Sequence, residues 1–144
     1  MNWKEEAVEK LRRYPVMAGA LQVIPLELQR LEREAGDLQG AGFTARGGSS
    51  ANNRAQENRL LDNLVRRKEL EQQLEQARLW VEVTQAGLAQ LDERERLILQ
   101  RLYGQQVDAV TLGRELGLER SSLYRCRDAA LKKLTLALYG VLES

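Results

Sequence analysis

The sequence predicts an all-α protein, built from an N-terminal helical hairpin of coiled-coil type and a C-terminal helix-turn-helix domain. Apolar residues recur at alternating spacings of three and four through two long segments, which is the period of paired helices. A stretch rich in Gly, Ser, Ala and Asn separates these segments, and the last third holds two short amphipathic patterns joined by a glycine. We therefore expect an arm over residues 1–90 and a helix-turn-helix domain over residues 91–144.

The arm is predicted from two apolar seams. The seam residues are Leu21, Ile24, Leu28, Leu31, Ala35 and Leu38 in the first, and Leu70, Leu74, Ala77, Val81, Thr84, Leu88 and Leu91 in the second. Residues 40–53 have no periodicity and few groups to bury, so we expect a mobile loop at the tip of the hairpin. The second helix is expected to run from about Gln56 to Ala89.

Two prolines shape the expected start of the arm. Because proline has no N–H to donate, Pro15 is expected to end a short helix over residues 2–14, and Pro25 to kink or begin the next one. The second helix then keeps an apolar stretch without a partner in the hairpin: Leu60, Leu61, Leu64 and Val65. This stretch could pack against residues 2–14 or against a second copy of the chain.

The way in which the seams are satisfied bears on function. If they pair within the chain, the hairpin is a spacer or a partner-binding arm. If they pair between chains, the arm is a dimerisation device, and a plain monomeric core is a third possibility. We favour a homo-oligomer, because one copy with little excess charge would bind a polyanion weakly.

The first helix of the C-terminal domain has a clear start signal. Asp92 can cap it, and Glu95 can reach back as in a capping box. Its inward face is predicted to comprise Leu97, Ile98, Leu102 and Tyr103, with Gly104 at its end.

The next two helices carry the helix-turn-helix pattern. Leu112 and Leu116 share one face of a short helix, and Gly113 between them allows a close approach of backbone. Gly117 is expected to leave that helix with a positive φ angle, and Leu118 to fill the turn. In the following helix, which starts near residue 121, Leu123 and Cys126 form the inward stripe; a further helical stretch runs to Tyr139.

The opposite face of this second helix is polar and basic, with five basic residues and one acid between Arg120 and Lys133. Such a helix can enter the major groove with its N-terminal residues facing base edges. Arg120 and Arg125 can each contact guanine through two hydrogen bonds, whereas Lys132 and Lys133 are placed for phosphates. The predicted DNA-binding residues are Thr111, Arg120, Ser121, Ser122, Tyr124, Arg125, Arg127 and Lys132.

Composition excludes several classes of protein. The 144 residues are 43% hydrophobic and 30% charged, which is typical of a folded helical protein. No apolar run approaches the roughly 20 residues needed to span a bilayer, and a single cysteine fits the reducing cytoplasm, here of a bacterial host cell. There is no histidine, no phosphate-binding glycine loop and no nucleophile paired with a base. We expect no enzyme activity, cofactor or metal.

Residues 91–134, LDERERLILQRLYGQQVDAVTLGRELGLERSSLYRCRDAALKKL, resemble the fourth conserved region of bacterial sigma factors. With a long helical segment before it, the whole chain resembles phage-encoded regulators of the ArpU and RinA type. The resemblance implies a promoter-reading domain whose base contacts match Arg120, Ser121, Tyr124 and Arg125. Ser121 and Tyr124 stand where the family usually has charged or amide groups.

The resemblance implies a transcription regulator of phage or prophage origin, with double-stranded DNA and RNA polymerase as partners. Two alternatives stay open at this point. One is a DNA-packaging protein similar to the small subunit of a phage terminase. The other is a protein-interaction adaptor whose helix-turn-helix does not engage DNA. The net charge of +1 argues for modest affinity from a single copy.

Overall fold

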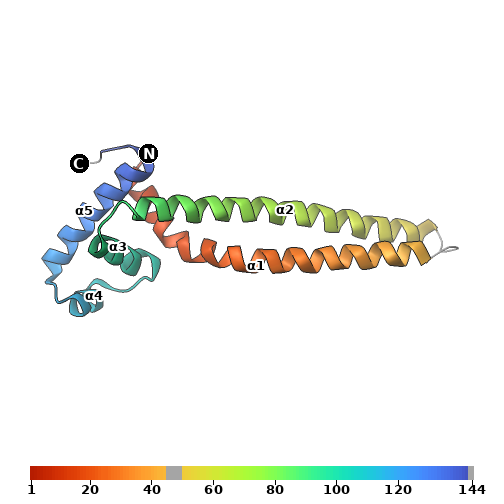
Figure 1. The fold of residues 1–144 in the computed structure, drawn as a ribbon, viewed down its shortest axis with the longest axis horizontal. Coiled ribbons are helices and arrows are strands. Elements are labelled where there is room, and N and C mark those ends of the chain that lie inside the picture. Colours follow the sequence, from red (N-terminus) through yellow and green to blue (C-terminus); the bar gives the residue numbers. More distant parts are fainter. Residues whose placement is uncertain (45–49, 143–144) are drawn as a thin grey trace. The chain divides into compact units, whose positions relative to one another are not determined.

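The computed structural model describes residues 1–44 and 50–142, and these residues form an all-α fold without a strand among them. The helices are α1 (Trp3–Thr44), α2 (Ser50–Leu88), α3 (Glu93–Leu99), the π-helical turn η1 (Gln100–Gly104), α4 (Ala109–Leu116) and α5 (Arg120–Tyr139) (Figure 1). The all-α class is as expected.

The chain divides into two compact units. The head unit comprises Met1–Ala18 together with Arg78–Ser144, and the arm unit comprises Gly19–Ala77. This division does not follow the expected boundary between residues 90 and 91. The reason is packing: Ala7 and Leu11 from the start of α1 are buried in one core with Leu88 and Leu131. The ends of both long helices therefore belong to the head unit.

Pro15 does not end a helix, contrary to expectation, because α1 runs through both Pro15 and Pro25. Proline inside a helix removes one backbone hydrogen bond and costs about 3 kcal/mol or more. Contacts with α2 offset that cost near Pro15. The Trp80 indole N–H donates to the Lys10 carbonyl at 3.0 Å, and the Gln85 amide donates to the Tyr14 hydroxyl at 2.8 Å.

In the arm unit, α1 and α2 run side by side in opposite directions (Figure 1). Leu31 and Ala35 on α1, and Leu70 and Ala77 on α2, are buried as the seams predict. In this structure the seams pair within one chain. The buried Asn63 amide crosses the seam and donates to the Leu31 carbonyl at 2.9 Å.

This contact corrects the expectation that the stretch containing Leu60 and Leu61 needs a partner beyond the hairpin. Because α1 is longer than expected, Asn63 lies opposite Leu31. The inward positions in this part of α2 are polar, so the apolar pattern missed them: Gln56, Asn63 and Arg67. Leu61, Leu64 and Val65 remain on the outer surface, 58%, 40% and 49% exposed.

The expected loop over residues 40–53 is shorter than predicted, because α1 extends to Thr44 and α2 begins at Ser50 rather than near Gln56. The rest of that loop, residues 45–49, lies outside the described residues. Within the described part of the chain, no helix combines the length and apolar character needed to cross a bilayer.

Candidate nucleic-acid interface

The relative placement of α4 and α5 is fixed by a small apolar core in the head unit. Ile98 of α3, Leu112 of α4 and Leu123 of α5 are each fully buried and pack together. Leu116 and Cys126 pack against this cluster and are partly buried. The predicted inward stripes of both helices are therefore confirmed.

The inward face of α3 differs from its prediction at one position. Leu97 is 41% exposed, whereas Leu99 is buried in the core that contains Leu11 and Leu131. The expected start is confirmed: the Glu95 N–H donates to the Asp92 carboxylate at 2.8 Å, and the Asp92 N–H donates back to Glu95 at 3.1 Å. The helix continues past Leu99 as η1, which ends at Gly104.

The turn between α4 and α5 has the expected left-handed residue. Gly117 has φ 65° and ψ 33° and caps α4. The close approach expected at Gly113 is made to the turn rather than to the second helix. A β-carbon on Gly113 would lie 3.0 Å from the Leu118 carbonyl oxygen, and the Leu118 N–H already donates to the Gly113 carbonyl at 2.9 Å. The turn is therefore packed tightly against α4.

The outward face of α5 carries most of the residues predicted for DNA contact. Arg120, Ser121, Arg125 and Lys132 are exposed, and Ser122, Tyr124 and Arg127 are partly buried. Ser121, Arg125 and Lys132 follow one another at spacings of four and seven, so they lie along one side of the helix. They point away from Leu123, which is fully buried.

Tyr124 is held between two arginines. The guanidinium carbon of Arg120 lies 5.5 Å from the centre of its ring, and that of Arg127 lies 4.5 Å away. Arg120 also donates from Nε to the Tyr124 hydroxyl at 3.2 Å. Arg127 forms an ion pair with the neighbouring Asp128 at 2.9 Å, so its charge is partly neutralised, whereas Arg125 projects into solvent.

Two of the predicted phosphate contacts are occupied by other partners. The Lys133 ammonium lies 2.9 Å from the Glu95 carboxylate, and this contact joins α5 to α3. Its hydrogen bond with Glu95 raises the pKa of Lys133. Sequence reasoning had no signal for this pair, because 38 residues separate its members. Lys132 is left as the exposed lysine of the two.

Thr111 lies at the start of α4, as expected, and is exposed. Its hydroxyl donates to the Asp108 carboxylate at 2.9 Å, and its N–H donates to the same carboxylate at 2.7 Å. These two bonds lower the pKa of Asp108. A phosphate at this helix end would therefore have to displace or share an acidic cap.

Two further residues border the turn and were missed from the sequence. Arg114 and Glu119 line a shallow hollow together with Gly117 and Arg120, and both charged side chains are exposed. Arg114 is two positions from Leu112, so it faces away from the inward stripe, a signal that could have identified it. Glu119 is the N-cap residue of α5, and its side chain makes no capping hydrogen bond. Its negative charge opposes an approaching phosphate.

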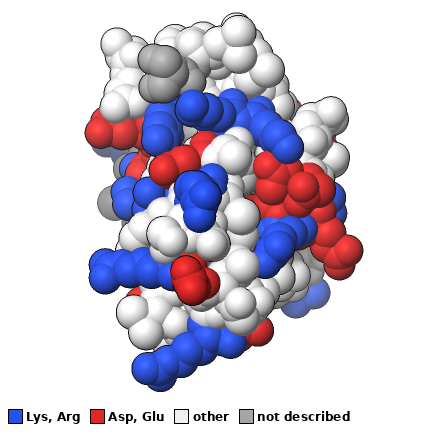
Figure 2. Space-filling view, turned by 90° about the vertical axis from the view of Figure 1, so that its left-hand side faces the viewer, with Lys and Arg blue, Asp and Glu red and all other residues white. Residues whose placement is uncertain are grey.

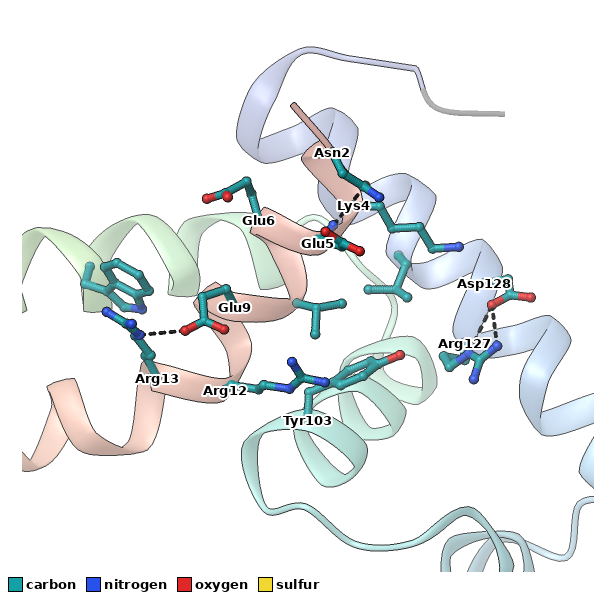
Figure 3. Close-up of a pocket in the computed structure, with 13 residues that line it drawn as sticks. Asn2, Lys4, Glu5, Glu6, Glu9, Arg12, Arg13, Tyr103, Arg127 and Asp128 are labelled. Carbon is teal, nitrogen blue, oxygen red and sulfur yellow. Dashed lines mark hydrogen bonds and ion pairs between the residues drawn. The ribbon is translucent and has the colours of Figure 1, made fainter.

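Basic and acidic side chains are interspersed on the side of the head unit that Figure 2 presents, without one large patch of either sign. The same balance holds in a groove between the start of α1, η1 and α5, drawn in Figure 3. Its charged residues are four basic and four acidic: Lys4, Arg12, Arg13, Arg127, Glu5, Glu6, Glu9 and Asp128. The Arg12 guanidinium lies over the Tyr103 ring, 6.0 Å from its centre. Burial raises the pKa of Tyr103. A groove with balanced charge gives a polyanion no net attraction.

Comparisons of the chain with protein-family models, with curated proteins and with solved structures found no match. Among the described residues, no group of three or more cysteine, aspartate or glutamate side chains is arranged to hold a metal ion.

Proposed function

We propose that the chain is a sequence-specific DNA-binding transcription regulator of phage or prophage origin. In this proposal α4 and α5 act as a helix-turn-helix, and the N-terminal half of α5 reads the major groove of double-stranded DNA. The observation that carries the proposal is the outward row of Ser121, Arg125 and Lys132 on a helix whose opposite side is anchored by Leu123. The phage or prophage origin rests on the resemblance of residues 91–134 to the sigma-factor region alone.

Each residue of this row suits a different part of a DNA site. Arg125 is one turn into α5 and exposed, so it can reach the O6 and N7 atoms of guanine. Ser121 sits where the backbone N–H groups of the helix start meet a phosphate. Lys132 lies two turns further along, where a backbone contact adds affinity without base choice.

Arg120 and Tyr124 form the second part of the proposed interface. Their hydrogen bond and ring contact reduce the number of conformations that the Arg120 side chain visits. Less entropy is then lost when Arg120 binds a base or a phosphate. Thr111 and Ser122 would contribute hydroxyl contacts at the edge of the site, and Arg127 would support Tyr124 rather than touch DNA.

Affinity from one copy is expected to be modest, because Glu119, Asp108 and the paired Arg127 limit the net positive charge of this face. Two copies on adjacent half-sites, or contact with RNA polymerase, would supply the rest. This homo-oligomer belongs to the proposal: in the structure the seams already pair within the chain, so a second copy would use other surfaces.

The test is selection of bound duplexes from a random pool, followed by titration of the selected site. We expect a recurrent motif, and we expect Arg125→Ala to weaken binding to it by about 1–3 kcal/mol and to relax choice at one base pair. Arg59→Ala is the matched control, because Arg59 is exposed on α2 in the arm unit. A pool that yields no motif, or equal binding by Arg125→Ala, contradicts the proposal.

A protein-interaction adaptor is the second candidate, and one observation favours it. Several large apolar side chains are exposed on the arm unit: Val23 at 64%, Leu26 at 65% and Leu61 at 58%. Such residues on an arm suit a protein partner better than DNA. Binding to random duplex that stays flat at low salt, where non-specific attraction is strongest, would support the adaptor and count against the regulator.

A further inference from the structure

A small hollow of about 280 Å³ lies in the head unit between α1, the end of α2 and η1. Leu11 and Leu88 contribute buried apolar surface to it. Its polar lining comes from Tyr14, Gln100 and Gln105, and none of the lining residues has a charged side chain. An ion placed here would lose water without gaining a counter-charge, so the hollow suits an uncharged molecule.

Three departures from regular backbone structure surround this hollow. Pro15 occupies the interior of α1, where proline is unfavourable. The opposite side is η1, a π-helical turn, and such turns are rare and frequent at functional sites. Gln106, directly after the hollow, has φ 55°, which is strained for a residue other than glycine. Strained backbone of this kind concentrates at ligand sites.

Pro15 also leaves one backbone carbonyl without its helical partner. In an α-helix the Leu11 carbonyl would accept the N–H of residue 15, and proline has none. This oxygen faces Gly104, because a methyl group added at Gly104 would lie 3.7 Å from it. The hollow therefore presents a hydrogen-bond acceptor on its α1 side.

Hydrogen-bond donors lie on the same hollow. The Tyr14 hydroxyl oxygen accepts a hydrogen bond from Gln85 at 2.8 Å, which leaves its own O–H to donate. The Gln105 side-chain oxygen accepts from Arg101 at 2.8 Å, which leaves the Gln105 NH₂ group as a donor. One acceptor and two donors beside apolar surface match a molecule that carries both an N–H and a C=O.

We propose that this hollow binds a small, uncharged molecule with an amide edge, of the lactam or cyclic-imide class. Its N–H donates to the Leu11 carbonyl, its C=O accepts from Tyr14 or Gln105, and its ring covers Leu11 and Leu88. This site is separate from the outward face of α5 and does not depend on the proposed DNA binding.

The probes are pyrrolidone and caprolactam, titrated into the isotope-labelled full chain and followed by NMR. Their open-chain forms, γ-aminobutyrate and ε-aminocaproate, are matched controls that carry charges. We expect saturable shifts in the millimolar range for the lactams, confined to residues 11–15 and 100–106, and no such shifts for the open-chain forms. Lactams that bind no better than their open-chain forms overturn the proposal.

Two substitutions test the geometry. Pro15→Ala restores the N–H that the Leu11 carbonyl lacks, so it should raise the midpoint of thermal unfolding and weaken caprolactam binding about tenfold. Gly104→Ala places a methyl group at ordinary contact distance from the same oxygen, so the fold is retained and binding is weakened as well.

Gly36→Ala, on the arm unit with open space around it, is the control and should leave caprolactam binding unchanged. Equal affinity in the wild type, Pro15→Ala and Gly104→Ala overturns the proposal. Because neither variant alters α5, failure here leaves the DNA titrations unaffected, and failure of DNA binding leaves the lactam titrations unaffected.

Discussion

The guanidinium of Arg127 lies 4.5 Å from the centre of the Tyr124 ring and is held by its ion pair with Asp128 at 2.9 Å. Arg120 approaches the same ring at 5.5 Å. Tyr124 is therefore a fixed aromatic element on the proposed reading helix, with an arginine on either side of it in the sequence. Its orientation depends on Arg127, and the orientation of Arg120 depends on its ring and hydroxyl.

Substitutions at Tyr124 should separate the ring from the hydroxyl. Tyr124→Phe keeps the platform for both arginines and removes the hydrogen bond from Arg120, so we expect a loss of less than about 1 kcal/mol of duplex binding. Tyr124→Ala removes both and should cost about 1–2 kcal/mol. Fluorescence anisotropy at one salt concentration measures both values. Equal losses for the two variants would contradict a role for the ring.

Glu119 should weaken DNA binding, because its exposed carboxylate lies at the start of α5. Glu119→Gln is expected to tighten duplex binding by up to about 1 kcal/mol at low salt, and by less as salt screens the charge. Glu57→Gln, exposed on α2 in the arm unit, is the control and should change nothing. Anisotropy titrations at two salt concentrations provide the measurement, and weaker binding by Glu119→Gln would place this end of α5 away from phosphate.

Two glycine substitutions should change stability in opposite directions. Gly113→Ala brings a β-carbon to 3.0 Å from the Leu118 carbonyl oxygen, so the turn must shift, and we expect about 1–3 kcal/mol of destabilisation. Gly36→Ala has nothing within 4 Å and should stabilise α1 by about 0.5–1 kcal/mol. Urea unfolding of both variants measures the difference. A neutral Gly113→Ala would mean that the turn is packed more loosely than the structure has it.

Asn63 should fix the register of the arm unit. Its buried side chain donates to Leu31 and accepts from Arg67 at 2.8 Å. Asn63→Asp removes the donor and brings a second carboxylate near Glu34, which lies 3.4 Å from the Asn63 amide. We expect about 1–3 kcal/mol of destabilisation, measured by urea unfolding. Unchanged stability would imply that another contact sets the register.

Acid should weaken the head unit through its two aspartate caps. Backbone N–H donation from Glu95 lowers the pKa of Asp92, and donation from Thr111 lowers the pKa of Asp108. A carboxylate whose folded pKa is depressed stabilises the fold above its unfolded pKa, about 3.9 for aspartate, and loses this contribution as pH falls through the folded value.

The matched variant for this prediction is the double substitution Asp92→Asn and Asp108→Asn, because asparagine also caps helices but carries no charge. We expect the wild type to have the higher midpoint of thermal unfolding near neutral pH. The two curves of midpoint against pH should converge below about pH 4. A difference that stays constant down to pH 2 would contradict the electrostatic account of these caps.

The features predicted correctly from the sequence are those that depend on local chemistry. The capping box at Asp92, the left-handed Gly117 and the buried Leu112 and Leu123 each follow from a few neighbouring residues. The exposed face of α5 follows from the same short-range period, because residues opposite Leu123 must face outward.

The features that were missed depend on contacts far apart in the chain. Pro15 lies within a helix because Trp80, 70 residues from Lys10, packs against that part of α1. Lys133 is paired with Glu95, and the start of α1 lies in the core of the head unit with Leu131. Such pairings cannot be read from spacing, so the expected boundary at residue 90 and the expected free Lys133 both differ from the structure.

The most direct test of the central claim is the binding of a labelled duplex at low salt by the wild type and by the double variant Arg120→Ala and Arg125→Ala. The account predicts saturable binding by the wild type, with a logarithmic salt slope that becomes shallower in the variant as phosphate or base contacts are lost. Identical titrations for the two proteins, or no binding by the wild type, would contradict it.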